Sequence, residues 1–295
     1  MSEPVSPSSS SPVVGVIGCG LMGSGIAEVC ARAGLVTTVV EATEEQAAAG
    51  RDRIGHSLDR AVKAGKLDHD ARDAAFDLVT VTTEMEALAP ADLVIEAIAE
   101  IEDLKIDVFR RLDAVVESPD AVLASNTSSI PIMKLAMATE RPGSVVGIHF
   151  FNPVPVLGLV ELVPSLLTAD ETLERARGFA EDVLGKKAIL CQDRAGFIVN
   201  ALLVPYILSA VRMMESGFAT AEDIDSGMVL GCAHPMGPLR LADLIGLDTI
   251  AAIADSLYEE FKEPLYAAPP LLSRMADAGL LGRKSGRGFY AYDQT

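Results

Sequence analysis

Basic residues are scarce in this chain, and their scarcity narrows the classes of partner it can have. Only 24 lysines and arginines stand against 42 aspartates and glutamates, which gives a formal net charge of −18 at pH 7. A protein that binds nucleic acid or an anionic membrane surface needs a basic face. The composition therefore predicts no nucleic-acid partner and no membrane partner.

Cysteine is also scarce, which bears on metal binding and on the cellular compartment. The chain has four cysteines, scattered along its length, and no two of them have CxxC spacing. A disulfide framework or a structural zinc site needs closer, paired spacings. We therefore expect no metal site and a protein of the reducing cytoplasm.

Long uninterrupted apolar runs are missing as well. The most apolar stretch, Val145–Leu167, is broken by three prolines, a histidine and a glutamate. Such interruptions are typical of buried elements in a globular protein rather than of a membrane span. Residues 1–12 are rich in serine and proline and lack an apolar signal core, so we expect a disordered tail there.

What the chain does have is a glycine-rich loop in a specific setting. The apolar run Val13–Ile17 predicts a buried strand, Gly18, Gly20 and Gly23 follow it, and a helix is expected over Ser24–Ala33. This order is typical of a dinucleotide-binding fold. There the first glycine allows a tight turn, the second lets the backbone approach the pyrophosphate, and the third allows close helix–strand packing.

The end of the next strand indicates which dinucleotide binds. Val36–Val40 predicts a second strand, and Glu41 follows it. A carboxylate at this position accepts hydrogen bonds from the ribose hydroxyls of adenosine and repels a 2′-phosphate. No arginine occurs in the next three residues. The sequence therefore predicts NAD rather than NADP.

Further apolar runs alternate with helical stretches. We expect strands at Leu78–Val81, Leu93–Ala97, Val122–Ser125 and Lys186–Leu190. This alternation predicts an α/β fold with a Rossmann-type doubly wound sheet.

After about Leu166 the strand signals fade, a helix is expected over 170–185, and helices dominate from Gly196 onward. We predict an NAD-binding domain over 13–194 and a smaller all-α C-terminal domain over 195–295 for the substrate and for dimerisation. The helix expected over Phe197–Met214 is apolar nearly all round, which favours a homodimer.

One imidazole and one carboxylate lie within the apolar stretch. If Val145–Phe151 and Leu157–Val163 form an antiparallel hairpin, His149 and Glu161 lie opposite one another on one face. Burying either group alone is costly, so we expect them in contact. A carboxylate fixes the tautomer of an imidazole and makes it a better base. The pair is a candidate catalytic dyad, although a histidine in a strand is more often a satisfied core residue.

Two other regions are candidate sites. Glu100 and the cluster Ser125–Ser129 each follow a predicted strand, at the end where ligands of such sheets bind, although such clusters are more often caps or turns. The stretch Arg51–Lys66 carries five basic residues against two acidic ones. It is either a solvated helix face or a landing site for an anionic substrate tail.

Several motifs occur in order along the chain. They are Gly18–Ala27, Ser125–Ser129, Gly147–Pro155, Gly196–Asn200, His234–Pro238 and Gly286–Tyr290. Together they resemble the single-function L-3-hydroxyacyl-CoA dehydrogenases, and among these the bacterial 3-hydroxybutyryl-CoA dehydrogenases. The resemblance extends over nearly all of Val13–Tyr292.

The resemblance implies a role for individual residues. His149 is the catalytic base and Glu161 its partner, while Ser128 and Asn200 hydrogen-bond the substrate near its reacting oxygens. The residues that match cofactor positions are Gly18, Gly20, Leu21, Met22, Gly23, Glu41, Glu100, Lys105, Asn152 and Lys284. Ser57 and Lys63 align loosely with a coenzyme A contact. Arg240 departs from the pattern, and either touches the acyl pocket or faces solvent.

The resemblance also implies the reaction: reversible, NAD-dependent oxidation of a short L-3-hydroxyacyl-CoA by a homodimer, with no metal. Two alternatives remain open. One is a dehydrogenase of a free 3-hydroxy acid, which the basic stretch argues against. The other is an NAD-binding protein without turnover, which the intact dyad argues against.

Overall fold

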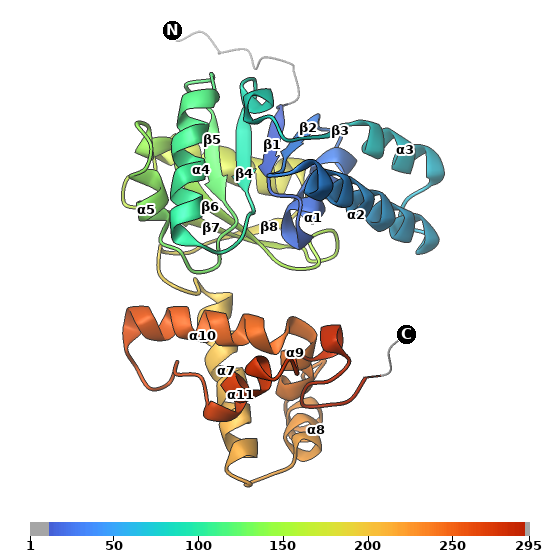
Figure 1. The fold of residues 1–295 in the computed structure, drawn as a ribbon, viewed down its shortest axis with the longest axis vertical. Coiled ribbons are helices and arrows are strands. Elements are labelled where there is room, and N and C mark those ends of the chain that lie inside the picture. Colours follow the sequence, from blue (N-terminus) through green and yellow to red (C-terminus); the bar gives the residue numbers. More distant parts are fainter. Residues whose placement is uncertain (1–11, 293–295) are drawn as a thin grey trace, which may run out of the picture. The chain divides into compact units, whose positions relative to one another are not determined.

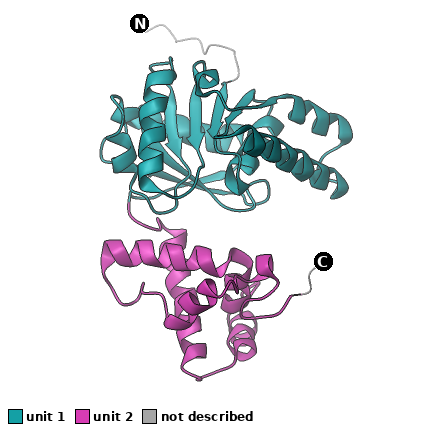
Figure 2. Cartoon of the chain, viewed as in Figure 1, with its two compact units in different colours: residues 1–193 teal, residues 194–295 magenta. Residues whose placement is uncertain are grey.

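The computed structural model describes residues 12–292. The tail expected over 1–12 lies outside the described residues, apart from Pro12. The chain divides into two compact units, the first ending at Asp193 and the second beginning at Arg194 (Figure 2). Each unit is described by itself.

The first unit is built on one sheet of eight strands. They are β1 (Val14–Ile17), β2 (Thr37–Val40), β3 (Val79–Thr82), β4 (Leu93–Glu96), β5 (Val122–Ser125), β6 (Val145–Phe150), β7 (Leu159–Pro164) and β8 (Lys187–Leu190). Their order is β3-β2-β1-β4-β5-β6-β7-β8 (Figure 1). All neighbours pair in parallel except β6 and β7, which are antiparallel. The predicted doubly wound sheet is confirmed.

Helices cover both faces of this sheet. They are α1 (Leu21–Arg32), α2 (Glu44–Lys63), α3 (His69–Asp77), α4 (Glu102–Val115), α5 (Ile132–Ala136) and α6 (Asp170–Gly178). Short 3₁₀ turns lie at Met85–Leu88 and Pro142–Ser144. α1 and α6 share one apolar core with alternate residues of the central strands, while α4 and α5 pack against each other on the opposite side (Figure 1).

The pleat of β6 decides the direction in which its histidine points. Ile148 and Phe150 belong to the core that contains α1 and α6. Gly147 faces the other way, since a Cβ built there would lie 2.9 Å from the Cδ1 of Ile132 in α5. Successive side chains of a strand alternate between faces, so His149 lies on the α5 side with Gly147.

Two predicted helices of the first unit differ from the observed ones. The first begins at Leu21 and not at Ser24, because Gly20 already occupies the position before the first turn. The helix expected over 170–185 is α-helical only to Gly178 and continues as a π-helix over Phe179–Val183. Glycine is a weak helix former, and the change of helix type follows it directly.

The second unit is helical, as expected. It contains α7 (Val199–Glu215), α8 (Ala221–Cys232), α9 (Pro238–Ile245), α10 (Leu247–Phe261) and α11 (Pro270–Asp277), followed by a 3₁₀ turn at Arg283–Ser285. Their apolar faces form one core of their own. Within residues 12–292, no helix has the length and apolar character needed to cross a membrane.

Candidate functional site

The glycine loop follows β1, at the carboxyl edge of the sheet. Gly18 has a φ of +88°, a left-handed conformation that favours glycine. A Cβ at Gly23 would collide with the carbonyl oxygen of Gly18, so the helix can approach the loop only without a side chain there. A Cβ at Gly20 would meet no atom within 4 Å. Nothing in the described chain therefore demands glycine at position 20, and the space beside it is open to a ligand.

A cleft of about 590 Å³ opens beside this loop. It is lined by residues at or just after the ends of β1, β2, β3 and β4, by one residue of α2 and by one face of α4: Ile17, Gly18, Gly20, Val40, Glu41, Ala42, Gln46, Thr83, Met85, Ala97, Ile98, Ala99, Leu104, Asp107, Val108 and Arg111. The helix α1 begins at the same edge, at the predicted cofactor residues Leu21 and Met22, and presents unpaired backbone amides.

Glu41 lies at the end of β2 in this cleft. One of its carboxylate oxygens accepts the N–H of Cys19 at 2.5 Å, and the other accepts the N–H of Ala42 at 3.1 Å. Each carboxylate oxygen has a second lone pair, so Glu41 can still accept ribose hydroxyls. The open position at Gly20, the amides of α1 and the acid of β2 together fit an adenine dinucleotide.

His149 and Glu161 are in contact, as the hairpin register predicts. The two residues are directly paired across β6 and β7. The Nδ1 of His149 lies 2.8 Å from the Oε2 of Glu161, with the carboxylate side chain fully buried and the imidazole 8% exposed. The ring of Phe151 meets the imidazole edge-on at a centroid distance of 4.6 Å. With Nδ1 held by a carboxylate, proton exchange with a ligand would use Nε2.

Asn152 follows directly after Phe151 and is the second residue of the loop between β6 and β7. Its side chain is exposed, and its peptide bond to Pro153 is cis. The neighbouring strand end is fixed by another asparagine, since the N–H of Phe150 donates to the Oδ1 of Asn126 at 2.8 Å. The carboxyl ends of β5 and β6 are thereby held together beside the dyad.

A buried ionic network lies at the carboxyl ends of β4 and β5. The Oε1 of Glu96 lies 2.5 Å from the Nζ of Lys105, and its Oε2 accepts the hydroxyl of Ser125 at 2.6 Å. Glu96 is fully buried and Lys105 is 1% exposed. The same ammonium lies 3.3 Å from Glu100. Lys105 was expected to line the cofactor, and the structure places its charge between two carboxylates.

Glu100 in turn organises the loop after β5. Its Oε1 accepts the hydroxyl of Thr127 at 2.5 Å and the backbone N–H groups of Ser128 and Ser129 at 2.9 and 3.2 Å. Burial alone would raise the pKa of Glu100, but the charge of Lys105 and these hydrogen bonds outweigh burial and lower that pKa. The predicted substrate residue Ser128 is thus positioned by the predicted cofactor residue Glu100.

Three residues of this region were not predicted from the sequence. Glu96 is an acid inside the apolar strand Leu93–Glu96, which is the same kind of signal that singles out His149. Asp107 and Arg111 line the cleft from α4, and their spacing of four residues places them on one helix face. Periodicity along α4 could have indicated this pair.

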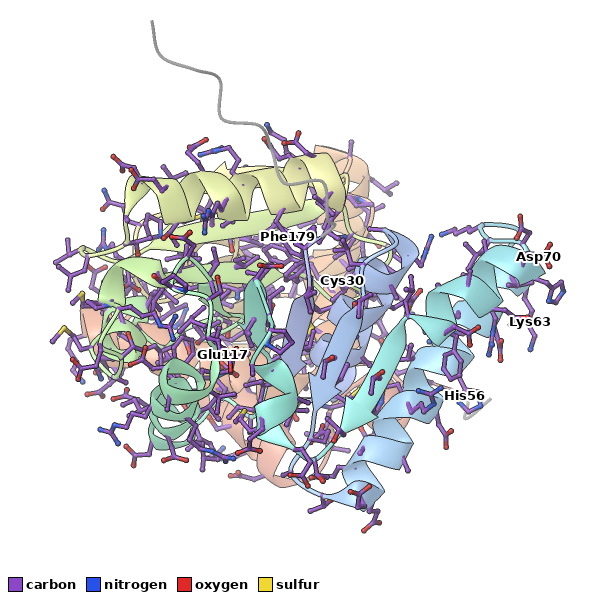
Figure 3. The ribbon with its side chains drawn as sticks, turned by 90° about the horizontal axis from the view of Figure 1, so that it is seen from above. Cys30, His56, Lys63, Asp70, Glu117 and Phe179 are labelled. Carbon is purple, nitrogen blue, oxygen red and sulfur yellow. The ribbon has the colours of Figure 1, made fainter. Side chains whose placement is uncertain are left out.

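The basic stretch lies on α2, which projects from the sheet together with α3 as a helical arm. Figure 3 shows Lys63 and Asp70 toward the outer part of this arm. Lys63 is exposed, and Ser57 is half-buried. These two candidate coenzyme A contacts remain predictions.

Two arginines of this stretch contact other parts of the first unit, and its interpretation as a landing site stays a prediction. Arg51 stacks on Phe76 at 4.4 Å and donates to the carbonyl of Val79 at 2.9 Å. Arg53 donates to the carbonyl of Cys19 in the glycine loop at 2.5 Å. Planar guanidinium groups serve such stacking and carbonyl contacts well, and net charge along the sequence does not reveal them.

The remaining predicted residues belong to the second unit. Asn200 lies in the first turn of α7 and is partly buried. The Nζ of Lys284 lies 2.6 Å from Asp248, and its charge, with backbone contacts, lowers the pKa of that carboxyl although burial opposes this. Arg240 is exposed and its guanidinium stacks on Tyr290 at 4.0 Å. Both alternatives for Arg240, a contact with the acyl pocket and a solvent-facing position, stay predictions.

Three of the four cysteines are buried. They are Cys19, Cys30 and Cys191, while Cys232 is exposed. Burial raises the pKa of both Cys19 and Cys30 to about 12. These two side chains therefore behave as inert apolar groups at neutral pH.

Comparison with known protein families covers both units. The family model for the NAD binding domain of 3-hydroxyacyl-CoA dehydrogenase matches residues 13–194, and that for its C-terminal domain matches residues 196–292. The 3-hydroxybutyryl-CoA dehydrogenase of Mycobacterium tuberculosis is 61% identical over 279 residues, which are 95% of this chain and 98% of that protein. The human mitochondrial hydroxyacyl-coenzyme A dehydrogenase is 41% identical over 286 residues, 95% of this chain and 90% of that protein.

Solved structures agree with these matches. The crystal structure of FadB2 from M. tuberculosis superposes with a TM-score of 0.95 at 60% identity and covers 96% of this chain and 99% of its own. The (S)-3-hydroxybutyryl-CoA dehydrogenase PaaH1 of Ralstonia eutropha has a TM-score of 0.90 at 43% identity, over 97% of this chain and 100% of its own.

Proposed function

Because this chain belongs to the 3-hydroxyacyl-CoA dehydrogenase family, we propose that it oxidises short-chain L-3-hydroxyacyl-CoA thioesters to 3-ketoacyl-CoA. The family assignment makes it an NAD-dependent oxidoreductase, as the motifs predicted. Relatives named 3-hydroxybutyryl-CoA dehydrogenase support 3-hydroxybutyryl-CoA as the substrate.

The contact between His149 and Glu161 carries the proposal. It joins a proton-exchanging group to a buried counter-charge at 2.8 Å, at the carboxyl edge of a sheet whose glycine loop fits a dinucleotide. An alcohol can lose a hydride only if its hydroxyl proton leaves as well, so the site needs a base at this edge.

Bound NAD supplies the acceptor for the hydride that leaves C3. The Nε2 of His149 takes the proton of the 3-hydroxyl group, and the C3–O bond becomes a carbonyl. Glu161 stabilises the positive charge that then develops on the imidazole. In the reverse direction the imidazolium returns the proton to the alkoxide.

Other side chains are proposed to hold the substrate. Ser128, whose backbone is bound by Glu100, and Asn200 of α7 would donate hydrogen bonds to the reacting oxygens as charge develops there. Asn152 and Lys284 would contact the cofactor, and Lys63 with its neighbour Ser57 would meet the coenzyme A tail.

The two units would divide these tasks. We propose that the first unit binds NAD and that the second contributes to the substrate site and to a homodimer. The exposed apolar side chains Leu202 and Leu230, 72% and 84% exposed on α7 and α8, support association through the second unit. The four cysteines are scattered along the chain without CxxC spacing, which supports a reducing cytoplasmic location.

The test is NADH oxidation at 340 nm with a series of 3-ketoacyl-CoA substrates and with free acetoacetate. Turnover with acetoacetyl-CoA and not with acetoacetate would support the proposal, whereas preference for the free acid would favour the alternative dehydrogenase. Absence of turnover with either would favour an NAD-binding protein without catalysis.

The variant His149→Gln tests the role of His149 as the base. We expect turnover to fall by about two to four orders of magnitude because general-base catalysis is lost, while NADH affinity, measured by fluorescence, stays nearly unchanged. A mild loss of turnover would remove His149 from the role of base.

A further inference from the structure

The loop between β6 and β7, residues 151–158, is held in place from two sides. It begins with Phe151, whose ring contacts His149, and continues with Asn152. It ends at Gly158, directly before β7. Val154, in its middle, is only 2% exposed, although the loop lies at the edge of the sheet. We call this segment the hairpin loop.

One side of the hairpin loop is held by Lys186, which precedes β8. The Nζ of Lys186 donates to the carbonyl of Val154 at 2.8 Å and to the carbonyl of Leu157 at 2.7 Å. Next to it, the N–H of Lys187 donates to the carbonyl of Gly158 at 2.7 Å. One ammonium therefore ties two carbonyls of the hairpin loop to the edge strand.

This ammonium has no counter-charge of its own. Lys186 is 8% exposed, and among residues 12–292 no carboxylate forms an ion pair with it. Burial, and secondarily the charge of Arg32, lowers the pKa of Lys186. A buried cation without a carboxylate destabilises a fold unless its hydrogen bonds compensate. Within the described part of the chain, the ammonium binds the carbonyls of Val154 and Leu157 in the hairpin loop, so its contacts serve that loop.

The other side of the hairpin loop rests on α1, the helix of the glycine loop. Val154 packs so closely on Gly25 that a Cβ there would lie 2.9 Å from the Cβ of Val154. The dinucleotide helix and the hairpin loop therefore share a contact surface without an intervening side chain. A shift of the loop would change the distance between α1 and the strand that carries His149.

We propose that Lys186 is a positioning residue for the reaction, which fixes the hairpin loop between β8 and α1 and so sets His149 and Asn152 relative to the cofactor helix. The inference rests on the proposed function. Lys186 itself takes no part in proton or hydride transfer. Its effect is on geometry, and a misplacement of about 1 Å at reacting groups costs on the order of a hundredfold in rate.

The test compares Lys186→Met with Lys187→Met. Methionine keeps most of the aliphatic length of lysine and removes the donor. Lys187 is the adjacent residue, its side chain is 76% exposed and its ammonium pairs with Glu181, so it controls for loss of a lysine at this strand. Turnover of acetoacetyl-CoA is divided by the number of NADH sites from fluorescence titration, which removes any loss of folded protein.

For Lys186→Met we expect kcat per NADH site to fall by about tenfold or more, with the KM for acetoacetyl-CoA within about threefold of wild type. Lys187→Met should keep wild-type kcat. A merely structural role would lower the number of NADH sites and leave kcat per site unchanged. A loss of kcat per site below about tenfold, or an equal loss in Lys187→Met, overturns the inference.

If Lys186→Met gives no folded protein, Lys186→Gln replaces it, with the same threshold. Glutamine is one atom shorter and its amide cannot donate to both carbonyls in the same way. Failure of the proposed function is a separate result, since wild-type protein would then not oxidise NADH with acetoacetyl-CoA. An active wild type with a fully active Lys186 variant contradicts only the positioning role.

Discussion

Replacing Glu161 by glutamine separates the contribution of the negative charge beside His149 from the contribution of the position in which the imidazole is held. The carboxylate is fully buried, and its Oε2 lies 2.8 Å from the Nδ1 of His149. Glutamine has nearly the same shape and retains one acceptor oxygen. The substitution therefore removes the negative charge beside the imidazole and leaves the packing of β6 and β7 in place.

The structure allows the loss to be estimated. Because the two side chains are 0% and 8% exposed, water screens the pair weakly, and a hydrogen bond to a charged group at this distance contributes about 1.5–3 kcal/mol. At about 1.4 kcal/mol per factor of ten, turnover should fall by about 10- to 150-fold. An amide that turns its NH₂ toward Nδ1 would select the wrong tautomer and deepen the loss.

The assay is steady-state turnover of acetoacetyl-CoA and of 3-hydroxybutyryl-CoA across a range of pH. Glu174→Gln, on α6 with a side chain 70% exposed, is the matched control and should behave as wild type. Turnover within about threefold of wild type, a loss smaller than one charged hydrogen bond, would refute the reasoning.

Three further predictions concern the cleft, acid stability and the thiols. Glu41→Ala should weaken NAD binding and relax the rejection of NADP. If the kinetic preference for NAD over NADP is unchanged in this variant, Glu41 does not contact the ribose. Because the fold lowers the pKa of Glu100, its ionised form stabilises the folded state above the pKa of the unfolded chain, and this contribution is lost as pH falls through the folded pKa. The difference in urea midpoint between wild type and Glu100→Gln should therefore be large at pH 7 and shrink below about pH 4; a constant difference would contradict it. At pH 8, a thiol reagent should react rapidly with one cysteine per chain, Cys232, and with all four after denaturation. Rapid reaction of Cys19 in the folded protein would contradict its burial.

Local pattern was enough to predict the sheet and the contact between His149 and Glu161, for identifiable reasons. The runs that became β1 to β8 are short and apolar, and buried parallel strands give just this signal. The pairing of His149 with Glu161 followed from the two-residue period of a strand and from a hairpin centred on Pro155, and the register confirms it. Both inferences need only neighbours along one or two segments.

Contacts between distant segments could not be predicted in this way. Lys105 approaches Glu96 only because α4 turns back over the end of β4, and Arg51 stacks on Phe76 only because α2 and α3 lie together. The net charge of a stretch does not reveal which of its members are already bound. The roles of Asn200 and Lys284 rest on family resemblance and not on any spacing in the chain.

Two glycines of the glycine loop, Gly20 and Gly23, are needed for different reasons. Position 23 is fixed by the chain itself, since any Cβ there meets the carbonyl of Gly18, whereas position 20 has no neighbour within 4 Å. The fold therefore requires glycine at position 23, and a bound dinucleotide would require it at position 20. A descendant that lost its cofactor would keep the first constraint and drift at the second. A glycine kept at position 20 would therefore indicate cofactor binding, whereas a glycine kept at position 23 indicates only the fold.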